Sequence, residues 1–303
     1  MADQLPTLIV PDVHEDIDTL RRLIEVADLT GVPVVFLGDM FDTFGVRHIE
    51  TADLYASLYQ KPGWTVLLGN HDVQYISNPI SRSPLLCSGY DRRTQSRVTQ
   101  MLDQHPELSA QFRLTTLVHG WVVSHAGITS GWMKSAGLDH VCDVNEAFRY
   151  AWNRTPFALT EHPVFAAGAD RGGLVPYGGP LWCDFQSLAY DANPLGNQIV
   201  GHTVGQTIRR RFTYASDRTT IQSMAICLDT ALQHVALVYP RMHPLEPARV
   251  QVVQIPKGDT SRLQERIQTP PDSLTFVRDR ALMCDETPKQ AASRTTDDVI
   301  RYL

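Results

Sequence analysis

The sequence has few cysteines and no long apolar run. Its 303 residues contain only Cys87, Cys142, Cys183, Cys227 and Cys284, none of them in a Cys-x-x-Cys pair. This odd number at wide spacings argues against a disulfide framework and against a zinc ribbon. No stretch approaches the roughly 20 apolar residues of a membrane-spanning helix, and no basic segment precedes the short apolar run near the start. We therefore expect a cytoplasmic protein with no membrane partner.

An excess of positive charge is also missing. The chain has 27 Lys and Arg residues against 33 Asp and Glu residues, a formal net charge of -6. A mildly acidic protein has no overall attraction to nucleic acid or anionic lipid, so we do not expect a nucleic-acid partner. The local exception is Arg209-Arg210-Arg211, which we interpret as a solvated edge rather than a phosphate contact. The hydrophobic fraction of 43% is ordinary for a globular protein.

The first part of the chain alternates between short apolar runs and helical spacing. Residues 5–10, 32–37 and 64–68 predict buried strands, and residues 17–29 and 48–59 predict helices. This alternation predicts an α/β fold in which helices cover a parallel-type sheet.

The alternation is less regular after residue 70. Helical spacing recurs near residues 94–102, and further strands are predicted at residues 121–124, 198–200, 224–228, 233–239 and 250–255. Residues 129–180 are predicted to form a helical and looped insertion, rich in Gly and Pro near its end. We predict a main domain of residues 1–255. The polar extension of residues 256–303 is either a docked helix or a loosely ordered tail.

Polar side chains that can bind metal follow five of the predicted strands. In chain order they are Asp12 and His14, then Asp39, Asn70, His125 and His202. Ligands of open α/β sheets bind at the carboxyl ends of strands, so we expect these residues to converge. Each residue alone could be a helix cap, a turn residue or a chance histidine. Because all six residues come at the ends of predicted strands, the pattern favours a metal site. It also favours His125 over His119 as a ligand, because His119 precedes its strand.

The motifs around these residues resemble those of the calcineurin-like metallophosphoesterases. They read D-V-H (12–14), G-D-M-F-D (38–42), G-N-H-D (69–72), S-H-A-G (124–127) and G-H-T (201–203). The resemblance covers about Leu8 to Tyr239. It is greatest for the branch of serine/threonine protein phosphatases and diadenosine tetraphosphatases, because Val204 stands where many other branches have a second histidine. It implies a four-layer α/β/β/α sandwich with two mixed sheets and the insertion over the active site.

The same resemblance implies a binuclear metal centre. Manganese is favoured, and iron and zinc are alternatives. Asp12, His14 and Asp39 would hold one divalent ion, and Asp39 would bridge to a second that also takes Asn70, His125 and His202. Carboxylate, imidazole and amide oxygen donors suit these metals without a thiolate. The two cations would activate a hydroxide that attacks the phosphate.

His71 and Asp42 have a separate implied role. His71 would protonate the leaving alkoxide as a general acid, and the Asp42 carboxylate would orient its ring. Asp42 could instead be a turn or cap residue. Asp72 could simply stabilise the turn after the third strand.

An arginine typical of protein phosphatases is missing. Those enzymes have an arginine directly after the position of Asp42, where it clamps the substrate phosphate, and this chain has Thr43. Arg47 and Arg171 are the candidate substitutes, with Arg92 and Arg93 as a third possibility. Each could instead be a solvent-facing arginine.

We predict a hydrolase that is a metal-dependent phosphoesterase acting on phosphate monoesters, related to the protein phosphatases. Its substrate would be a phosphoprotein, a nucleotide or a small phosphoester. The alternative enzyme is a dinucleoside polyphosphate hydrolase or a phosphodiesterase, which Ser-His-Ala-Gly-Ile (124–128) and the long insertion favour. An inactive binding module on the same fold is the alternative of another class. The presence of all six ligands and of His71 argues against it.

Overall fold

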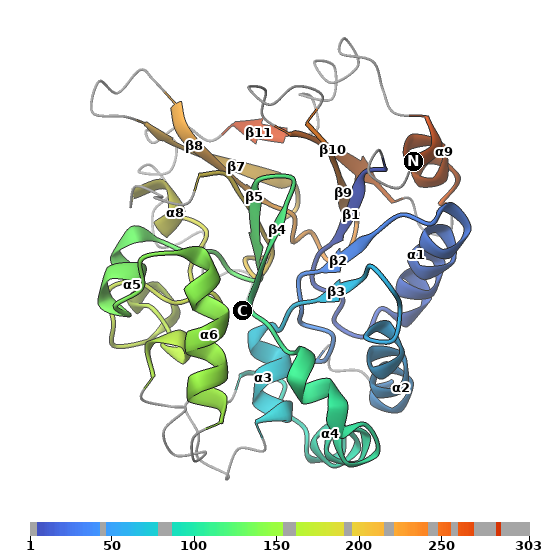
Figure 1. Cartoon of the computed structure of the whole chain (residues 1–303), viewed down its shortest axis with the longest axis horizontal. Coiled ribbons are helices and arrows are strands. Elements are labelled where there is room, and N and C mark those ends of the chain that lie inside the picture. Colours follow the sequence, from blue (N-terminus) through green and yellow to red (C-terminus); the bar gives the residue numbers. More distant parts are fainter. Residues whose placement is uncertain are drawn as a thin grey trace.

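Two mixed β-sheets form the centre of the computed structural model (Figure 1). The first sheet has the order β10-β9-β1-β2-β3 and the second the order β11-β7-β8-β6-β5-β4. The first contains β1 (Thr7–Val10), β2 (Val34–Phe36), β3 (Thr65–Val66), β9 (His234–Tyr239) and β10 (Arg249–Gln254). The second contains β4 (Thr115–Val118), β5 (Trp121–Ser124), β6 (Gln198–Val200), β7 (Ile208–Tyr214), β8 (Ile221–Cys227) and β11 (Met283–Asp285). The structure describes residues 5–42, 47–77, 87–153, 162–190, 196–214, 221–241, 248–255, 260–269 and 283–285.

Each sheet combines parallel and antiparallel strands, and the parallel ones form one end of the first sheet and the centre of the second. In the first sheet β1, β2 and β3 run parallel, and β9 and β10 continue the sheet with antiparallel pairing. In the second sheet β5, β6 and β8 run parallel, β4 is antiparallel to β5, and β7 is antiparallel to β8 but parallel to β11. The predicted α/β class with two mixed sheets is therefore confirmed.

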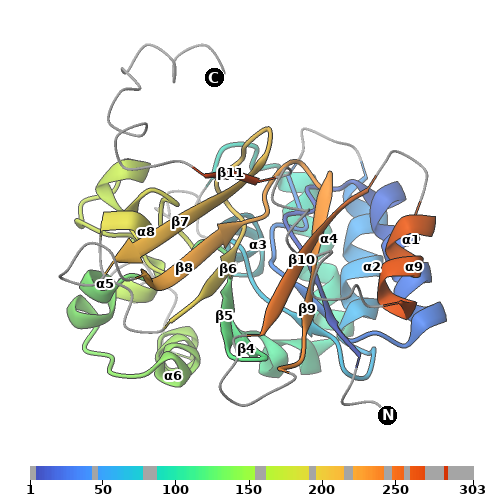
Figure 2. The ribbon, with the colours of Figure 1, turned by 90° about the horizontal axis from the view of Figure 1, so that it is seen from above.

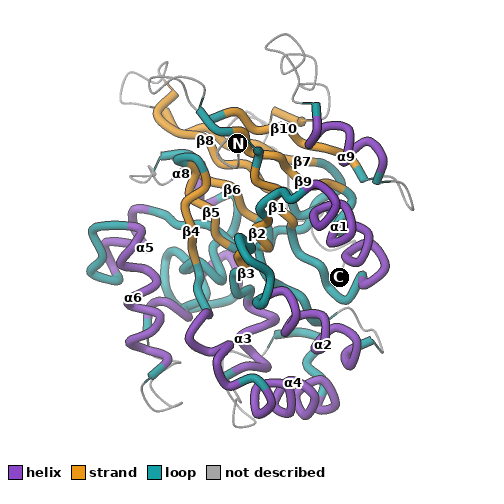
Figure 3. The backbone as a smooth tube through the Cα atoms, turned by 45° about the vertical axis from the view of Figure 1, so that its right-hand side comes forward, coloured by secondary structure: helices purple, strands orange, loops and turns teal. Residues whose placement is uncertain are grey.

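Helices cover the outer faces of the two sheets. The longer ones are α1 (Ile17–Thr30), α2 (His48–Leu58), α4 (Arg92–Gln104), α6 (Val141–Trp152) and α9 (Ser261–Gln268). The shorter ones are α3 (Asn70–Ile76), η2 (Pro106–Gln111), α5 (Ser130–Ser135), η3 (Pro163–Phe165), η4 (Ala169–Arg171) and α8 (Ser187–Tyr190). Figure 2 shows α1, α2 and α9 on one side of the molecule and α8 on the other, and Figure 3 shows α4 close to α2 and α3. No helix in the described part of the chain is long and apolar enough to cross a membrane.

The alternation of side chains along β1 explains the layers. Leu8 and Val10 belong to the core beneath the helices, whereas Ile9 points to the opposite face of the strand. There Ile9 shares a buried cluster with Val123 of β5 and Ile226 of β8. The two sheets therefore pack face to face, with a helical layer outside the first sheet.

The strand β7 corrects one sequence prediction. Arg209-Arg210-Arg211 does not lie at a solvated edge, because β7 pairs with β8 on one side and with β11 on the other. Arg211 is only 5% exposed. Arg209 and Arg211 point to one face of the sheet, and their guanidinium carbons lie 5.4 and 5.7 Å from the ring centroid of Phe185. The positive charges therefore stack on a core aromatic ring.

The sequence patterns also missed β4, β7 and helix α3. The residues of β7 are polar because one of its faces is filled by arginines, so no apolar alternation is visible. Helix α3 has only seven residues and begins inside the G-N-H-D motif. A helix this short has too few turns for the periodic spacing of its apolar residues to be recognised in the sequence.

The C-terminal extension is described at two places. Helix α9 packs on α1, and its residues Leu263 and Ile267 are buried in the main core. Strand β11 pairs in parallel with β7 at the end of the second sheet. The remaining residues of the extension lie outside the described part of the chain.

The packing of α9 predicts a measurable contribution to stability. Ile267→Ala should lower the free energy of unfolding by about 2–5 kcal/mol, because it removes a fully buried side chain and leaves a cavity. Arg262→Ala, at an exposed position of the same helix, is the control. Urea unfolding of both variants measures the difference. Equal stability of the two variants would show that α9 is not held to the core.

Candidate metal centre

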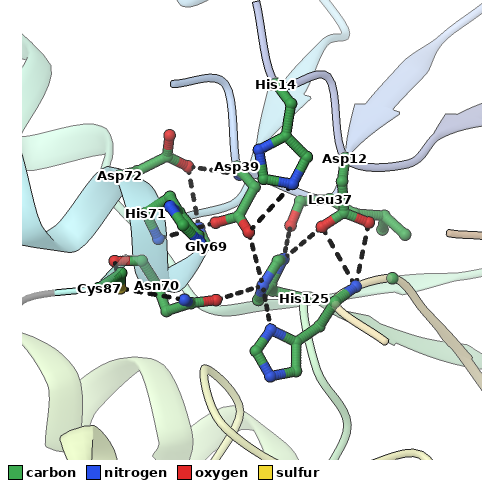
Figure 4. A network of polar contacts seen from close by, with 12 residues as sticks. Asp12, His14, Leu37, Asp39, Gly69, Asn70, His71, Asp72, Cys87 and His125 are labelled. Atoms are coloured by element: carbon green, nitrogen blue, oxygen red, sulfur yellow. Dashed lines mark hydrogen bonds and ion pairs between the residues drawn. The ribbon is translucent and has the colours of Figure 1, made fainter. Parts of the chain in front are cut away.

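Six side chains from five strand ends converge at one place in the structure (Figure 4). They are the six predicted ligands, Asp12, His14, Asp39, Asn70, His125 and His202. Among the described residues, two groups could hold a metal ion, and in each group the ligand atoms lie within 4.8 Å of one another. One group is Asp12, His14 and Asp39, and the other is Asp39, His125 and His202. The Asp39 carboxylate is therefore common to both groups.

The first group presents one nitrogen of His14 to the Asp39 carboxylate. His14 Nε2 lies 3.8 Å from Asp39 Oδ2. The other ring nitrogen, Nδ1, lies 3.1 Å from the carbonyl oxygens of Phe41 and Asp42. A proton on Nδ1 satisfies these carbonyls and leaves the lone pair of Nε2 free for a metal ion.

The second group is arranged around the fully buried His125. Its Nδ1 lies 3.0 Å from the carbonyl oxygen of Leu37, which selects the tautomer with a proton on Nδ1. Its Nε2 then carries a lone pair, and it faces Asn70 Oδ1 at 2.9 Å, His202 Nδ1 at 3.0 Å and Asp39 Oδ2 at 3.4 Å. Burial lowers the pKa of His125 to about 4, so the ring is neutral at neutral pH. Neutral imidazole is the form that binds metal.

These contacts fit a bound cation. Oxygen and nitrogen lone pairs face one another around His125 Nε2, and a positive charge between them would turn repulsion into attraction. Burial, together with the charges of Asp229 and Asp39, also raises the pKa of Asp12 well above its ordinary range. Taking buried carboxylates out of water is costly unless a cation compensates the charge. The donors are oxygen and nitrogen atoms without thiolate, a set that suits manganese, iron or zinc.

The Asp72 carboxylate joins the loops after β2 and β3. It accepts hydrogen bonds from the backbone N–H groups of Asp39 and Met40 at 2.8 Å each and of Gly69 at 2.9 Å. The loops touch so closely that a Cβ on Gly69 would overlap the Asp39 carboxylate. Asp72 therefore has the turn-stabilising role that the sequence suggested, and it holds together the loops that carry Asp39 and Asn70.

The His71 ring lies beside the metal ligands and contacts Asp42. Its Nδ1 is 2.9 Å from Asp42 Oδ2, and its backbone N–H donates to Asp39 Oδ1 at 2.9 Å. Burial alone would lower the pKa of His71, but the carboxylates of Asp39 and Asp42 outweigh it and raise the pKa above its ordinary value. The ring is therefore able to carry a proton near neutral pH.

The candidate arginines occupy different surroundings. Arg171 Nη2 donates to the hydroxyl of Thr203, directly after His202, at 2.5 Å and pairs with Asp184 at 3.0 Å. Its charge is close enough to contribute to the low pKa of His202, after burial and the charge of His125. Arg47 instead pairs with Asp18 at 2.9 Å and Glu50 at 3.0 Å.

Other residues near the motifs have different contacts. Arg92 and Arg93 are exposed in the first turn of α4. His119 lies in the turn between β4 and β5, where its Nε2 is 3.3 Å from the Thr7 hydroxyl. Trp182, in the Leu-Trp-x-Asp stretch, meets the ring of His202 edge-on with centroids 5.8 Å apart.

Asp229 is a site residue that the sequence reasoning missed. It follows β8 directly, is 3% exposed, and its charge acts on Asp12. Burial raises its own pKa. The signal was present, because Asp229 follows a strand of the same sheet as His125 and His202 do.

The comparison with protein families agrees with these motifs. A model of the calcineurin-like phosphoesterases matches residues 5–206 of the chain. The chain belongs to the calcineurin-like phosphoesterase family. The resemblance drawn from the five motifs is therefore confirmed. No curated protein matches this phosphoesterase.

Solved structures with a similar course of the chain are distant in sequence. A metallophosphoesterase from Sphaerobacter thermophilus is 15% identical, with 92% of this chain and 99% of that chain covered and a TM-score of 0.45. A serine/threonine phosphatase from Saccharomyces cerevisiae is 14% identical, with 85% and 82% covered and a TM-score of 0.44. A putative diadenosine tetraphosphatase is 16% identical, with 84% and 96% covered and a TM-score of 0.38.

The geometry predicts that metal binding stabilises the phosphoesterase. Manganese at about 100 times its dissociation constant should add about 2.7 kcal/mol to the free energy of unfolding, because the folded protein alone assembles the ligands. Asp39→Asn should remove most of this gain, since it weakens both groups. His119→Ala, a histidine outside the groups, should keep it. Thermal melting of chelator-treated protein with and without manganese measures the effect, and an equal gain in Asp39→Asn would contradict the assignment.

Proposed function

We propose that this phosphoesterase hydrolyses phosphate monoesters with two divalent metal ions, manganese being favoured. The observation that carries the proposal is the shared Asp39 carboxylate, which belongs to both groups of ligand atoms. One ion would be held by Asp12, His14 and Asp39. The other would be held by Asp39, Asn70, His125 and His202. When bound, the two cations would supply positive charge that polarises the phosphoryl group and acidifies the attacking water.

The chain's own residues supply the proton for the leaving group. His71 Nδ1 is engaged by Asp42, so its other ring nitrogen, Nε2, is free to hold the proton that the leaving oxygen takes. The raised pKa of His71 supports this role, because a general acid must be protonated before the reaction. The carboxylate of Asp42 holds the ring and stabilises its charged form.

Arg171 is proposed to bind the substrate phosphate. It comes from the insertion and lies beside Thr203, next to the ligand His202. Both arginines pair with carboxylates, Arg171 with Asp184 and Arg47 with Asp18 and Glu50. The position of Arg171 beside the loop of His202 is what supports it over Arg47. An arginine fork matches two phosphate oxygens, which would compensate for the arginine that is missing after Asp42.

The proposal predicts the outcome of two substitutions. In manganese-loaded protein, His71→Ala should lower kcat for phenyl phosphate roughly 100-fold to 10,000-fold, because the leaving oxygen loses its proton donor. Asp39→Asn should abolish hydrolysis, because both metal groups lose their common ligand. If the manganese-loaded wild type hydrolyses no phosphate ester, the protein is a binding module and the proposal is wrong.

A substrate panel separates the proposed activity from the alternative enzyme. The wild type should hydrolyse phenyl phosphate and a phosphopeptide much faster than diadenosine tetraphosphate or bis-p-nitrophenyl phosphate. The opposite preference would identify a dinucleoside polyphosphate hydrolase or a phosphodiesterase.

The two candidate arginines can be distinguished by binding. Arg171→Ala should raise KM for phenyl phosphate roughly tenfold, since a charge-assisted pair with phosphate is worth about 1.5–3 kcal/mol. Arg171→Lys should restore part of the affinity, because the charge returns without the planar fork. Arg47→Ala should change KM much less. If Arg47→Ala has the larger effect, the phosphate-binding role belongs to Arg47.

A further inference from the structure

Three side chains of helix α3 reach the same carboxylate. His71, Gln74 and Tyr75 are three and four residues apart, a spacing that places them on one side of a helix. His71 Nδ1 is 2.9 Å from Asp42 Oδ2, and the Gln74 side-chain amide donates to the same oxygen. The Tyr75 hydroxyl donates to Asp42 Oδ1. One short helix therefore engages both oxygens of Asp42.

The two additional donors are fixed from their other side. The side chains of Gln74 and Tyr75 are fully buried. Gln74 Oε1 accepts a hydrogen bond from the backbone N–H of Cys87 at 2.8 Å, and the Tyr75 hydroxyl accepts one from the backbone N–H of Asp91 at 3.0 Å. These bonds orient the amide and the hydroxyl, so their donor hydrogens point to Asp42 independently of His71.

The same segment also orients a metal ligand. Asn70 Nδ2 donates to Cys87 Sγ at 3.1 Å, which leaves Asn70 Oδ1 directed to His125. Only the oxygen end of an amide can bind a metal ion. Cys87 therefore contacts Gln74 through its backbone and Asn70 through its side chain. The His71–Asp42 pair and the candidate ligand Asn70 both depend on the position of Cys87.

We propose that Gln74 and Tyr75 are positioning residues for the His71–Asp42 pair. The inference rests on the proposed hydrolysis, in which His71 protonates the leaving oxygen. Asp42 has a left-handed backbone with φ of 70°, a conformation that needs support from its surroundings. Without Gln74 and Tyr75, His71 would be the only side chain among the described residues that holds the Asp42 carboxylate, and both would lose their orientation.

The experiment compares two substrates that differ in their need for a proton. Phenolate is a basic leaving group that needs protonation, whereas 2,4-dinitrophenolate departs without it. In manganese-loaded protein, Tyr75→Phe and Gln74→Met should each lower kcat for phenyl phosphate roughly tenfold or more, a fraction of what general acid catalysis supplies. Tyr75→Phe should change kcat for 2,4-dinitrophenyl phosphate less than about twofold and leave KM unaltered, because the Tyr75 hydroxyl acts on proton transfer alone.

Tyr55→Phe is the matched control. Tyr55 is also a fully buried tyrosine, and its ring meets Phe41 edge-on at 5.5 Å as Tyr75 does at 5.7 Å. Its hydroxyl bonds to Tyr59 instead of Asp42. Tyr55→Phe should leave the ratio of the two rates unchanged. An equal change of this ratio in Tyr55→Phe and Tyr75→Phe would overturn the proposal.

Two further readouts separate positioning from a general structural role. The manganese-induced rise in melting temperature should be the same in Tyr75→Phe and wild type. In an Asp42→Ala background, Tyr75→Phe should not alter the ratio of rates again, because the two residues act through one interaction. The proposal would be overturned if Tyr75→Phe lowered kcat equally on both substrates or reduced the manganese-induced rise in melting temperature. A further change of the ratio of rates in the Asp42→Ala background would also overturn it. Wild type that hydrolyses neither substrate would instead overturn the proposed function, and this inference with it.

Discussion

The hydrogen bonds of one buried carboxylate determine how two loops of the first sheet meet. Asp72 accepts from Asp39 and Met40 after β2 and from Gly69 after β3. The donors belong to separate segments, so Asp72 fixes the distance between them. Asp39 obtains its position from this bond, and Asn70 and His71 obtain theirs from the start of α3 beside it. The residue that organises the site is therefore not itself one of the six candidate ligands.

The loops also accept backbone conformations that are unfavourable on their own. His14, Asp39, Asp42 and His202 all have positive φ, between 45° and 70°. Each such residue costs of order 1–3 kcal/mol and persists only when its surroundings hold it. Here the Asp39 carbonyl accepts from the N–H groups of residues 13 and 14, and the His202 N–H donates to the Asp12 carboxylate. Hydrogen bonds between the loops thus hold the strained backbone conformations that aim the side chains at one another.

The site has two sides that differ in origin and in charge. Strand ends supply the carboxylates and imidazoles, and burial keeps His125 in the neutral form that binds cations. The insertion supplies Arg171, and the Leu-Trp-x-Asp stretch directly after it supplies Trp182; both lie against the loop of His202. Helix α3 separates the candidate ligand Asn70 from the proposed proton donor His71, because the two residues are adjacent but face different partners. Separate elements can therefore adjust metal affinity, proton transfer and substrate contact.

Local patterns in the sequence were enough to predict much of the fold. Strands β1, β2 and β3 were visible because their apolar runs are short, buried and ended by polar residues. The six candidate ligands were visible for the same reason, since each lies within about four residues of the end of a strand. Strand β7 was not predictable, because Arg211 is buried and Arg209 half-buried against Phe185, a residue distant from them in the sequence.

The sequence by itself determined which chemical groups stand at the ends of the strands, because strand ends and side-chain types are local properties. Only the tertiary structure decided which of these groups meet. Arg47 and Arg171 are the same residue type, and each pairs with carboxylates, yet Arg47 does so on Asp18 and Glu50, whereas Arg171 does so on Asp184 and lies beside Thr203, next to the candidate ligand His202. Likewise, the proposed role of Gln74 and Tyr75 depends on their hydrogen bonds to Asp42, about thirty residues away in the sequence. Contacts of this kind depend on how the chain brings distant segments together, and no local spacing encodes them.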